Sequence, residues 1–269
     1  MAIRVVSMNM CRKPAAKTNL ILLLLLFSFL YGFSQDNYEI QVYASETLAK
    51  NHTMLELHSN FTFDGTTQTI DGVLPTNHML HETIEVTHGF SNIFEIGFYF
   101  FNAIGSDNRT AYVGSHIRPR IMVPKDWNWP VGVSLSLEGG FQKSEYSTDT
   151  WTLEIRPIID KTMGRFYVSV NPTFEKSFKG LNQNVGLIFS PNAKASYNLT
   201  KVVAAGFEYY GSYGPLYDIY PPPQQAQQLF FAIDLEWSPD WEFNCGYGIG
   251  NSPSTGSQIF KVILGYRFH

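Results

Sequence analysis

The sequence predicts an all-β protein: a closed, up-and-down antiparallel transmembrane β-barrel of about 12 strands. Three observations support this prediction. After the first 34 residues, apolar and polar residues alternate in segments of about ten, separated by clusters of Gly, Asn, Asp, Ser and Pro. The connections between segments tend to alternate between short and longer ones. Four of the five tryptophans lie in or beside two of the short connections.

Each segment has the period of two that is typical of a strand, because successive side chains of a strand point to opposite faces. The segments are bounded by residues that favour turns. In chain order, the expected strands span residues 53–63, 80–90, 94–102, 111–122, 131–142, 151–159, 165–175, 184–197, 202–213, 228–237, 241–250 and 258–269.

One face of every expected strand is apolar. In the first six strands this face carries Leu55, Leu57, Phe61, Ile84, Val86, Phe94, Ile96, Phe98, Phe100, Val113, Ile117, Ile121, Val131, Val133, Leu135, Leu137, Phe141, Leu153, Ile155 and Ile159. In the last six it carries Phe166, Val168, Val170, Phe174, Val185, Leu187, Phe189, Val203, Phe207, Tyr209, Leu229, Phe231, Ile233, Leu235, Phe243, Tyr247, Ile249, Phe260, Val262 and Leu264.

The opposite face carries most of the charge, whereas the apolar face has one charged residue, Glu82, at the entry of a strand. The charges on the polar face are Glu56, Glu85, Glu95, Glu138, Glu154, Glu175, Glu208, Asp234, Glu236, Glu242, Arg118, Arg120, Arg156, Lys194, Lys261 and Arg267. This separation indicates that the apolar face is removed from water, either by packing inside the protein or by contact with lipid.

Two architectures produce such faces. A soluble β-sandwich turns its apolar face inward, whereas a membrane barrel turns it to lipid and turns the charged face to the lumen. The apolar face is rich in Phe and has few Gly or Ala, as lipid contact allows. Trp127 and Trp129 lie in one short connection, and Trp237 and Trp241 flank another, as in an interfacial aromatic belt. The sequence therefore favours the barrel, with both termini in the periplasm.

Residues 1–34 have the features of a secretory signal peptide. Basic residues and no acidic residue precede the apolar run 20–33, and Gly32 and Ser34 suit a cut before Gln35. The run is shorter than the ~20 residues that a membrane-spanning helix needs. We expect residues 35–51 to form a short periplasmic lead and residues 52–269 to form an outer-membrane β-barrel of Gram-negative type.

The charge and cysteine content exclude some partners. The predicted mature chain keeps 15 basic and 23 acidic residues, and an acidic exported chain is unsuited to nucleic acid. Cys11 lies in the signal peptide, which leaves Cys245 alone, so no disulfide can form within the mature chain. No later segment approaches 18 consecutive apolar residues, so no later transmembrane helix is expected.

The last ten residues, FKVILGYRFH, stop inside their alternation. Unpaired backbone groups at a sheet edge are costly in lipid, so a membrane sheet must close, and we expect residues 258–269 to pair with 53–63. A last strand that ends in an aromatic, here Phe268 followed by His269, also resembles the signal read by barrel assembly machinery. The expected partners are outer-membrane lipid and that machinery, and the sequence does not indicate an oligomeric state.

Three stretches carry a family resemblance: LPTNHMLHETIEVTHGFSNIFEIGFYF, HIRPRIMVPKDWNWPVGVSLSLEGGF and TWTLEIRPIIDK. They resemble the outer-membrane barrels grouped as the MetA-pathway-of-phenol-degradation family, which is similar in turn to porin-like and long-chain fatty-acid transporter barrels. The resemblance covers nearly the whole mature chain. It implies the fold and the location, and it implies no catalytic residues.

The first candidate site is a lumen constriction. Symmetric connections would place Glu95 across from His116, with Glu138 near His116. Two interpretations remain open: a polar constriction that selects or gates solute, or paired charges that fill a narrow lumen for stability. The candidate residues are Glu95, His116, Arg118, Glu138, Glu154 and Arg156.

A second candidate is an acidic periplasmic mouth. Glu236 and Glu242 flank the turn WSPDW on the lumen side, where they either favour cations or form a solvated rim.

The third candidate is a defect in the barrel wall. A proline within a strand removes a ladder hydrogen bond, and Pro172 and Pro191 fall on neighbouring strands. They either mark a weak wall, through which an apolar solute could pass sideways into lipid, or lie at bulges or near the membrane edge. Pro119 and Pro157 lie within other strands.

Catalytic and metal sites are not indicated. Residues i and i+3 of a strand face opposite ways, so His78 and His81 do not form a metal site. A lipase-like enzyme is disfavoured, because the lipid-face Ser115 lies two strands from His88 and no GxSxG motif occurs. We expect no cofactor and no metal.

The expected function is passive passage of a small solute, apolar or aromatic ones included, across the outer membrane. The alternative is a closed structural or surface-interaction barrel in which the loops 64–79 and 214–227 act.

Overall fold

The computed structural model describes residues 37–250 and 258–269. The predicted signal peptide lies outside these residues. Twelve strands are present: β1 Thr53–Asp64, β2 Leu80–Ser91, β3 Phe94–Ile104, β4 Thr110–Met122, β5 Gly132–Gln142, β6 Asp149–Met163, β7 Phe166–Gly180, β8 Ile188–Asn198, β9 Val203–Ser212, β10 Ala226–Leu235, β11 Trp241–Gly250 and β12 Gln258–Phe268. Two short 3₁₀ helices, η1 Lys125–Trp127 and η2 Pro222–Gln224, lie in connections.

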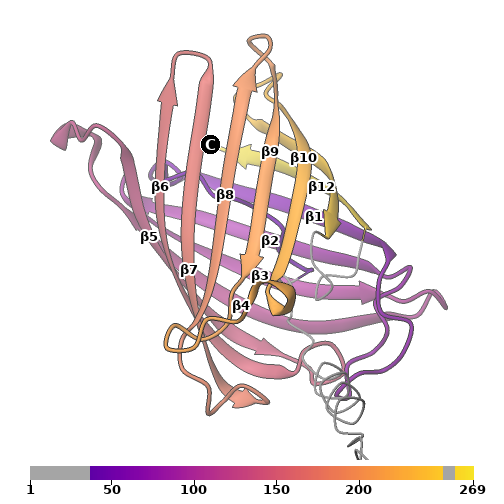
Figure 1. Ribbon diagram of the computed structural model, residues 1–269. Coiled ribbons are helices and arrows are strands. Elements are labelled where there is room, and N and C mark those ends of the chain that lie inside the picture. The colour runs from indigo at the N-terminus through magenta and orange to yellow at the C-terminus, as the bar shows by residue number, and fades with distance from the viewer. Residues whose placement is uncertain (1–36, 251–257) are drawn as a thin grey trace, which may run out of the picture. The chain divides into compact units, whose positions relative to one another are not determined.

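The strands form a closed antiparallel barrel in which each strand pairs with its sequence neighbours and β1 pairs with β12. The closing seam runs from Thr53 opposite Phe268 to Asp64 opposite Gln258. In Figure 1 the strands β6 to β10 cross the opposite wall at a steep angle, as expected for the tilted strands of a barrel. The predicted fold class, strand order and closing pair are therefore confirmed.

The two faces of the wall are as the alternation predicts. Leu55, Phe98 and Leu135 are among the apolar side chains that remain 42–44% exposed, on the outer face. Glu95, Arg118 and other charged side chains of the opposite face are buried in the lumen. No helix in residues 37–250 and 258–269 is long and apolar enough to cross a membrane.

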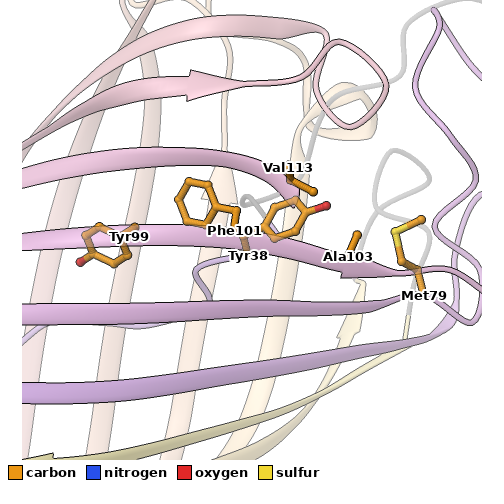
Figure 2. Close-up of a cluster of buried hydrophobic side chains, with 6 residues drawn as sticks. All are labelled: Tyr38, Met79, Tyr99, Phe101, Ala103 and Val113. Atoms are coloured by element: carbon orange, nitrogen blue, oxygen red, sulfur yellow. The ribbon is translucent and has the colours of Figure 1, made fainter. Parts of the chain in front are cut away.

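One strand departs from the alternation. The pairing of β3 with β4 shifts register between Phe101 and Asn102, because β4 holds an extra residue there. Val113, expected on the apolar outer face, is therefore fully buried on the inside. It belongs to an apolar cluster with Tyr38, Tyr99 and Phe101 (Figure 2).

Several strands also begin or end at residues other than the predicted ones. β6 and β7 each span 15 residues and extend beyond the expected 151–159 and 165–175. β8 begins at Ile188 rather than at residue 184.

An aromatic group marks the end of the barrel where β1 begins and β12 ends, hereafter the short-turn end. Trp237 and Trp241 stack with ring centroids 6.2 Å apart, and Trp241 packs edge-on against Tyr266 at 4.8 Å. Trp127 and Trp129, which are 63% and 52% exposed, lie in the connection between β4 and β5 at the same end. Exposed indole rings at one level of a barrel suit a membrane–water interface.

Because the outer face of the strands is apolar, we expect a charged substitution there to destabilise the barrel far more than one in a solvent-exposed loop. Leu135→Arg, in the middle of β5, should lower the free energy of unfolding in lipid by roughly 2–4 kcal/mol, because it places a charge in hydrocarbon. Leu216→Arg is the matched control, since Leu216 is 49% exposed but lies in the connection between β9 and β10. Urea unfolding in phospholipid vesicles measures both, and equal losses would contradict the assigned outer face.

Candidate functional site

The lumen is occupied by the chain's own segment 37–50, which precedes β1. Tyr38, Ile40 and Tyr43 are 0–5% exposed. Residues 35–51 were predicted to form a short periplasmic lead, and in the structure residues 38–43 of this stretch lie largely buried inside the barrel, whereas Ala49 and Lys50 are exposed. Its sequence YEIQVYA alternates like a strand, and the lumen provides partners for both of its faces.

One face of this lumen segment is apolar. Ile40 and Val42 pack with Tyr210, Phe230 and Ile259 on the wall formed by β9, β10 and β12. Tyr38 packs against Phe101 (Figure 2). Their ring centroids are 5.5 Å apart. These contacts hold the segment by burial of apolar surface on two sides of the barrel.

The backbone of the segment is held by lumen side chains, with no strand ladder among the described residues. The Nζ of Lys261 donates to the carbonyl of Ile40 at 3.0 Å. Six further hydrogen bonds, all between 2.6 and 2.9 Å, hold the backbone of the segment. Its carbonyls accept from Thr83 Oγ1 (at Tyr38), from Ser169 Oγ (at Tyr43) and from Arg120 (at Ala44 and Glu46). Its amides donate to Asn171 Oδ1 (from Tyr43) and to Glu95 Oε2 (from Leu48). The segment is therefore fixed by side chains that can also bind water.

Tyr43 lies at the centre of the lumen network. Its ring lies 4.9 Å from the guanidinium of Arg118 and 4.7 Å from that of Arg156, within the range of a cation–π contact. Its hydroxyl donates to Glu39 and lies 2.9 Å from the hydroxyl of Tyr99. One aromatic side chain of the segment thus joins two separate wall arginines.

The predicted constriction residues form two groups around this tyrosine. In the first, Arg118 binds Glu85 and Glu95, and Arg120 also binds Glu95. In the second, Arg156 binds Glu154 at 2.6 Å and Glu39 of the segment at 3.0 Å.

The register corrects two details of the predicted constriction. Glu95 lies opposite Arg120, and Tyr99 takes the position across from His116, because the connection closes with Ile104 opposite Thr110 and β4 holds one extra residue further along. His116 does contact Glu138 as expected, at 2.8 Å. Arg118 forms its ion pairs with Glu85 and Glu95.

Sequence reasoning missed Glu39 and Tyr43 as site residues, since both were assigned to the lead. It also missed a second buried cluster on the opposite wall. There Lys261 binds Glu208, and Lys194 binds both Glu208 and Asp234, at 3.2 and 2.7 Å. The alternation places these side chains in the lumen, but only the register shows that they meet.

Below the constriction, a cavity of about 1600 Å³ opens at the short-turn end. Glu236 and Glu242, the predicted mouth residues, both line it, together with Trp237 and Trp241. Glu242 binds Arg267 at 2.6 Å. The mouth is therefore a wide vestibule in which one of the two predicted carboxylates is already paired with a cation.

The wall prolines lie where backbone pairing is interrupted. Pro172 and Pro191 lie directly opposite each other, but the ladder between β7 and β8 continues through them. The interruptions fall on the two adjacent seams. β6 and β7 do not pair between Ile155 and Ile159, around Pro157 and Pro172, and β8 pairs regularly with β9 only from Asn192 onward. The weak wall at Pro172 and Pro191 stays a prediction. The unpaired backbone lies between β6 and β7 and between β8 and β9, not between the two proline strands β7 and β8.

A further interruption follows Ile117 of β4, where pairing with β5 stops and resumes at Arg120. A recess of about 540 Å³ lies at this break. Its lining is mostly apolar and includes Phe98, Leu137 and Trp151 of the outer face, with His116 and Glu138 also in its wall.

No protein-family model and no curated protein sequence matches the chain. Among solved structures, it is similar to a KdgM porin with a TM-score of 0.54 and 12% identity, over 80% of this chain and 99% of the porin. It is also similar to a NanC porin with a TM-score of 0.52 and 8% identity, over 79% and 98% of the two chains. A KdgM porin in complex with disordered oligogalacturonate gives a TM-score of 0.51 and 11% identity, over 80% and 99%.

These similarities concern the fold: the chain is a porin-like barrel of twelve strands. The proteins that it is similar to are porins rather than enzymes. None of the comparisons shows the MetA-pathway-of-phenol-degradation family.

Proposed function

We propose that the protein is a channel in the outer membrane of a Gram-negative type of cell, for the passive passage of small solutes, and that segment 37–50 gates it. The observation that carries the proposal is the noncovalent occupation of the lumen. Side chains of a complete barrel wall hold the segment, and a vestibule of about 1600 Å³ lies at one end.

The gate is suited to release. A segment paired as a thirteenth strand would need its whole ladder broken, whereas this one is held largely by separate side-chain contacts. A neutral hydrogen bond contributes only about 0.5–1.5 kcal/mol net, and one to a charged group about 1.5–3 kcal/mol, because water replaces the lost partner. Water entering from the vestibule can satisfy the lumen side chains once the segment moves.

The lumen suggests which solutes pass. The charged side chains at its centre are largely paired with opposite charges, so a strongly acidic chain such as the oligogalacturonate of the KdgM complex has few free cations to bind. The wall rings of Tyr99, Tyr210 and Phe230 line the path that the segment occupies. We therefore propose small solutes with an apolar or aromatic part.

The alternative is a closed structural or surface-interaction barrel, in which the loops 64–79 and 214–227 act. The filled lumen is the observation that favours it. Conductance of the purified protein in a planar bilayer separates the two functions.

A reversible tether tests the gate directly. A Cβ placed on Gly132 would lie 3.2 Å from the Cβ of Ser45, slightly closer than the ~3.5–4.5 Å of a disulfide. It would also lie 2.1 Å from the Oδ1 of Asp160, so the end of that side chain must rotate away. Ser45→Cys with Gly132→Cys, in a Cys245→Ser background, should therefore link the segment to β5 on oxidation. We expect discrete conductance steps in the reduced protein and their loss in the oxidised one.

The Cys245→Ser protein alone is the control and should conduct equally under both conditions. Conductance that persists with the tether closed would contradict gating by the segment. An absence of conductance in every form would favour the closed barrel.

A further inference from the structure

Three potential metal ligands meet inside the barrel at the seam between β1 and β2. Glu56 and Glu85 lie directly opposite each other on the two strands, and His58 follows Glu56 by two residues. Residues two apart on a strand share a face, so all three side chains enter the lumen together. One ligand atom from each lies within 4.8 Å of the others.

Their geometry suits a tetrahedral ion. Two ligands that each lie about 2.0–2.2 Å from a zinc ion are roughly 3.3–3.5 Å apart. The Nε2 of His58 and the Oε2 of Glu85 are separated by 3.4 Å. Only Glu56 would need to move, by a rotation of a flexible side chain.

The polar atoms at this site lack other partners. His58 is fully buried, and neither of its ring nitrogens makes a hydrogen bond with the described residues. The Oε2 of Glu85 makes none either. Apart from the 3.4 Å ion-pair contact between the Nε2 of His58 and the Oε2 of Glu85, these atoms have no partner among the described residues. Buried polar groups of native proteins are nearly always satisfied, so the arrangement favours an additional ligand.

The charges indicate a cation. Arg118 pairs with Glu85 and Glu95, and Arg120 pairs with Glu95. Within the described part of the chain, no Lys, Arg or His forms an ion pair with Glu56, which is 6% exposed. Burial of a carboxylate without a cation is costly, and a divalent ion here would remove that cost.

The surroundings of the site are also organised. The other oxygen of Glu85 accepts hydrogen bonds from Arg118 and Thr87, the latter at 2.6 Å, which orients the carboxylate toward His58. Glu56 lines the 1600 Å³ cavity at the short-turn end, which gives an ion a path to the site.

We propose that Glu56, His58 and Glu85 bind a divalent first-row metal ion of the zinc class, with a fourth position left for water. One imidazole and two carboxylates are a donor set that zinc accepts in proteins. The sequence alone did not indicate this site, because its ligands come from two strands whose register was unknown.

Purified protein, stripped with a chelator, tests the proposal with zinc itself as the probe. After equilibration at roughly 100 µM free zinc, a hundredfold above a micromolar Kd, metal content is measured by mass spectrometry on protein freed of excess ion. We expect one zinc per chain, and an unfolding temperature that rises with zinc.

Two variants and one control make the test specific. His58→Phe and Glu56→Gln should each lose the bound zinc and the thermal shift. His81→Phe should keep both, because His81 is an equally buried lumen histidine outside the cluster, with a bond to the Asn60 carbonyl. Circular dichroism confirms that each variant remains a β-barrel.

Zinc retained by folded His58→Phe would overturn the proposal, because the ion would then lie elsewhere. Absence of zinc from the wild-type protein would overturn it too, and would assign His58 the role of a cation between two carboxylates. Because the readouts are metal content and stability, they are independent of whether the barrel conducts.

Discussion

Replacing Arg118 with alanine should lower the free energy of unfolding by about 3–5 kcal/mol, the range for a broken buried ion pair. Arg118 is 2% exposed and binds the carboxylates of Glu85 and Glu95. Its removal leaves Glu85 without an arginine, with His58 at 3.4 Å as its remaining ion-pair partner, and leaves Glu95 with Arg120 alone. The loss should appear as a lower urea midpoint in phospholipid vesicles.

Arg109→Ala is the matched control for this experiment. Arg109 also pairs with a carboxylate, that of Asp107, but its side chain is 88% exposed. Exposed pairs contribute about 0–1 kcal/mol. Losses of similar size for the two arginines would show that the lumen network is hydrated and does not stabilise the barrel.

Tyr43→Ala should release the lumen segment and increase conductance. The substitution removes the ring that contacts Arg118 and Arg156 and the hydroxyl that binds Glu39. Truncation of a buried aromatic costs about 3–5 kcal/mol, and here most of that loss falls on the contact between segment and wall. Single-channel recording should show a larger open fraction than in the wild-type protein.

Tyr43→Phe separates the ring from the hydroxyl. It keeps the cation–π contacts and removes the hydrogen bond to the Glu39 carboxylate, which contributes about 1.5–3 kcal/mol, so the open fraction should rise less than in Tyr43→Ala. Tyr217→Ala, at a position that is 74% exposed, should change nothing. An unchanged open fraction in Tyr43→Ala would show that Tyr43 does not hold the gate.

The wall of this barrel was predictable because its signal is local. A period of two fixes which side chains of a strand share a face, whatever the neighbouring strand is. Leu135 and Glu138 could therefore be assigned to opposite faces before any pairing was known. Val113 shows where the rule ends: one extra residue in β4 reverses the faces beyond it.

The lumen was less predictable because its contacts depend on register and on a segment without a partner strand. The position of Glu95 opposite Arg120 depends on the length and shape of the connection between β3 and β4. The alternating YEIQVYA of segment 37–50 gives the same signal as a short strand. The pattern does not distinguish a backbone that pairs with a neighbouring strand from one that is bound by side chains, such as those of Asn171 and Lys261.

The enclosed segment also has a consequence for the order in which the barrel forms. The ring closes where β1 meets β12, the two strands farthest apart in the chain. Bringing such distant residues together has a large entropic cost, which slows folding. The segment adds contacts that offset this cost, because it immediately precedes β1 and its Ile40 carbonyl binds Lys261 of β12, 221 residues away. If the strands assemble around residues 37–50, these contacts keep β1 and β12 near each other before they pair. A variant with weakened segment contacts should therefore close its barrel more slowly.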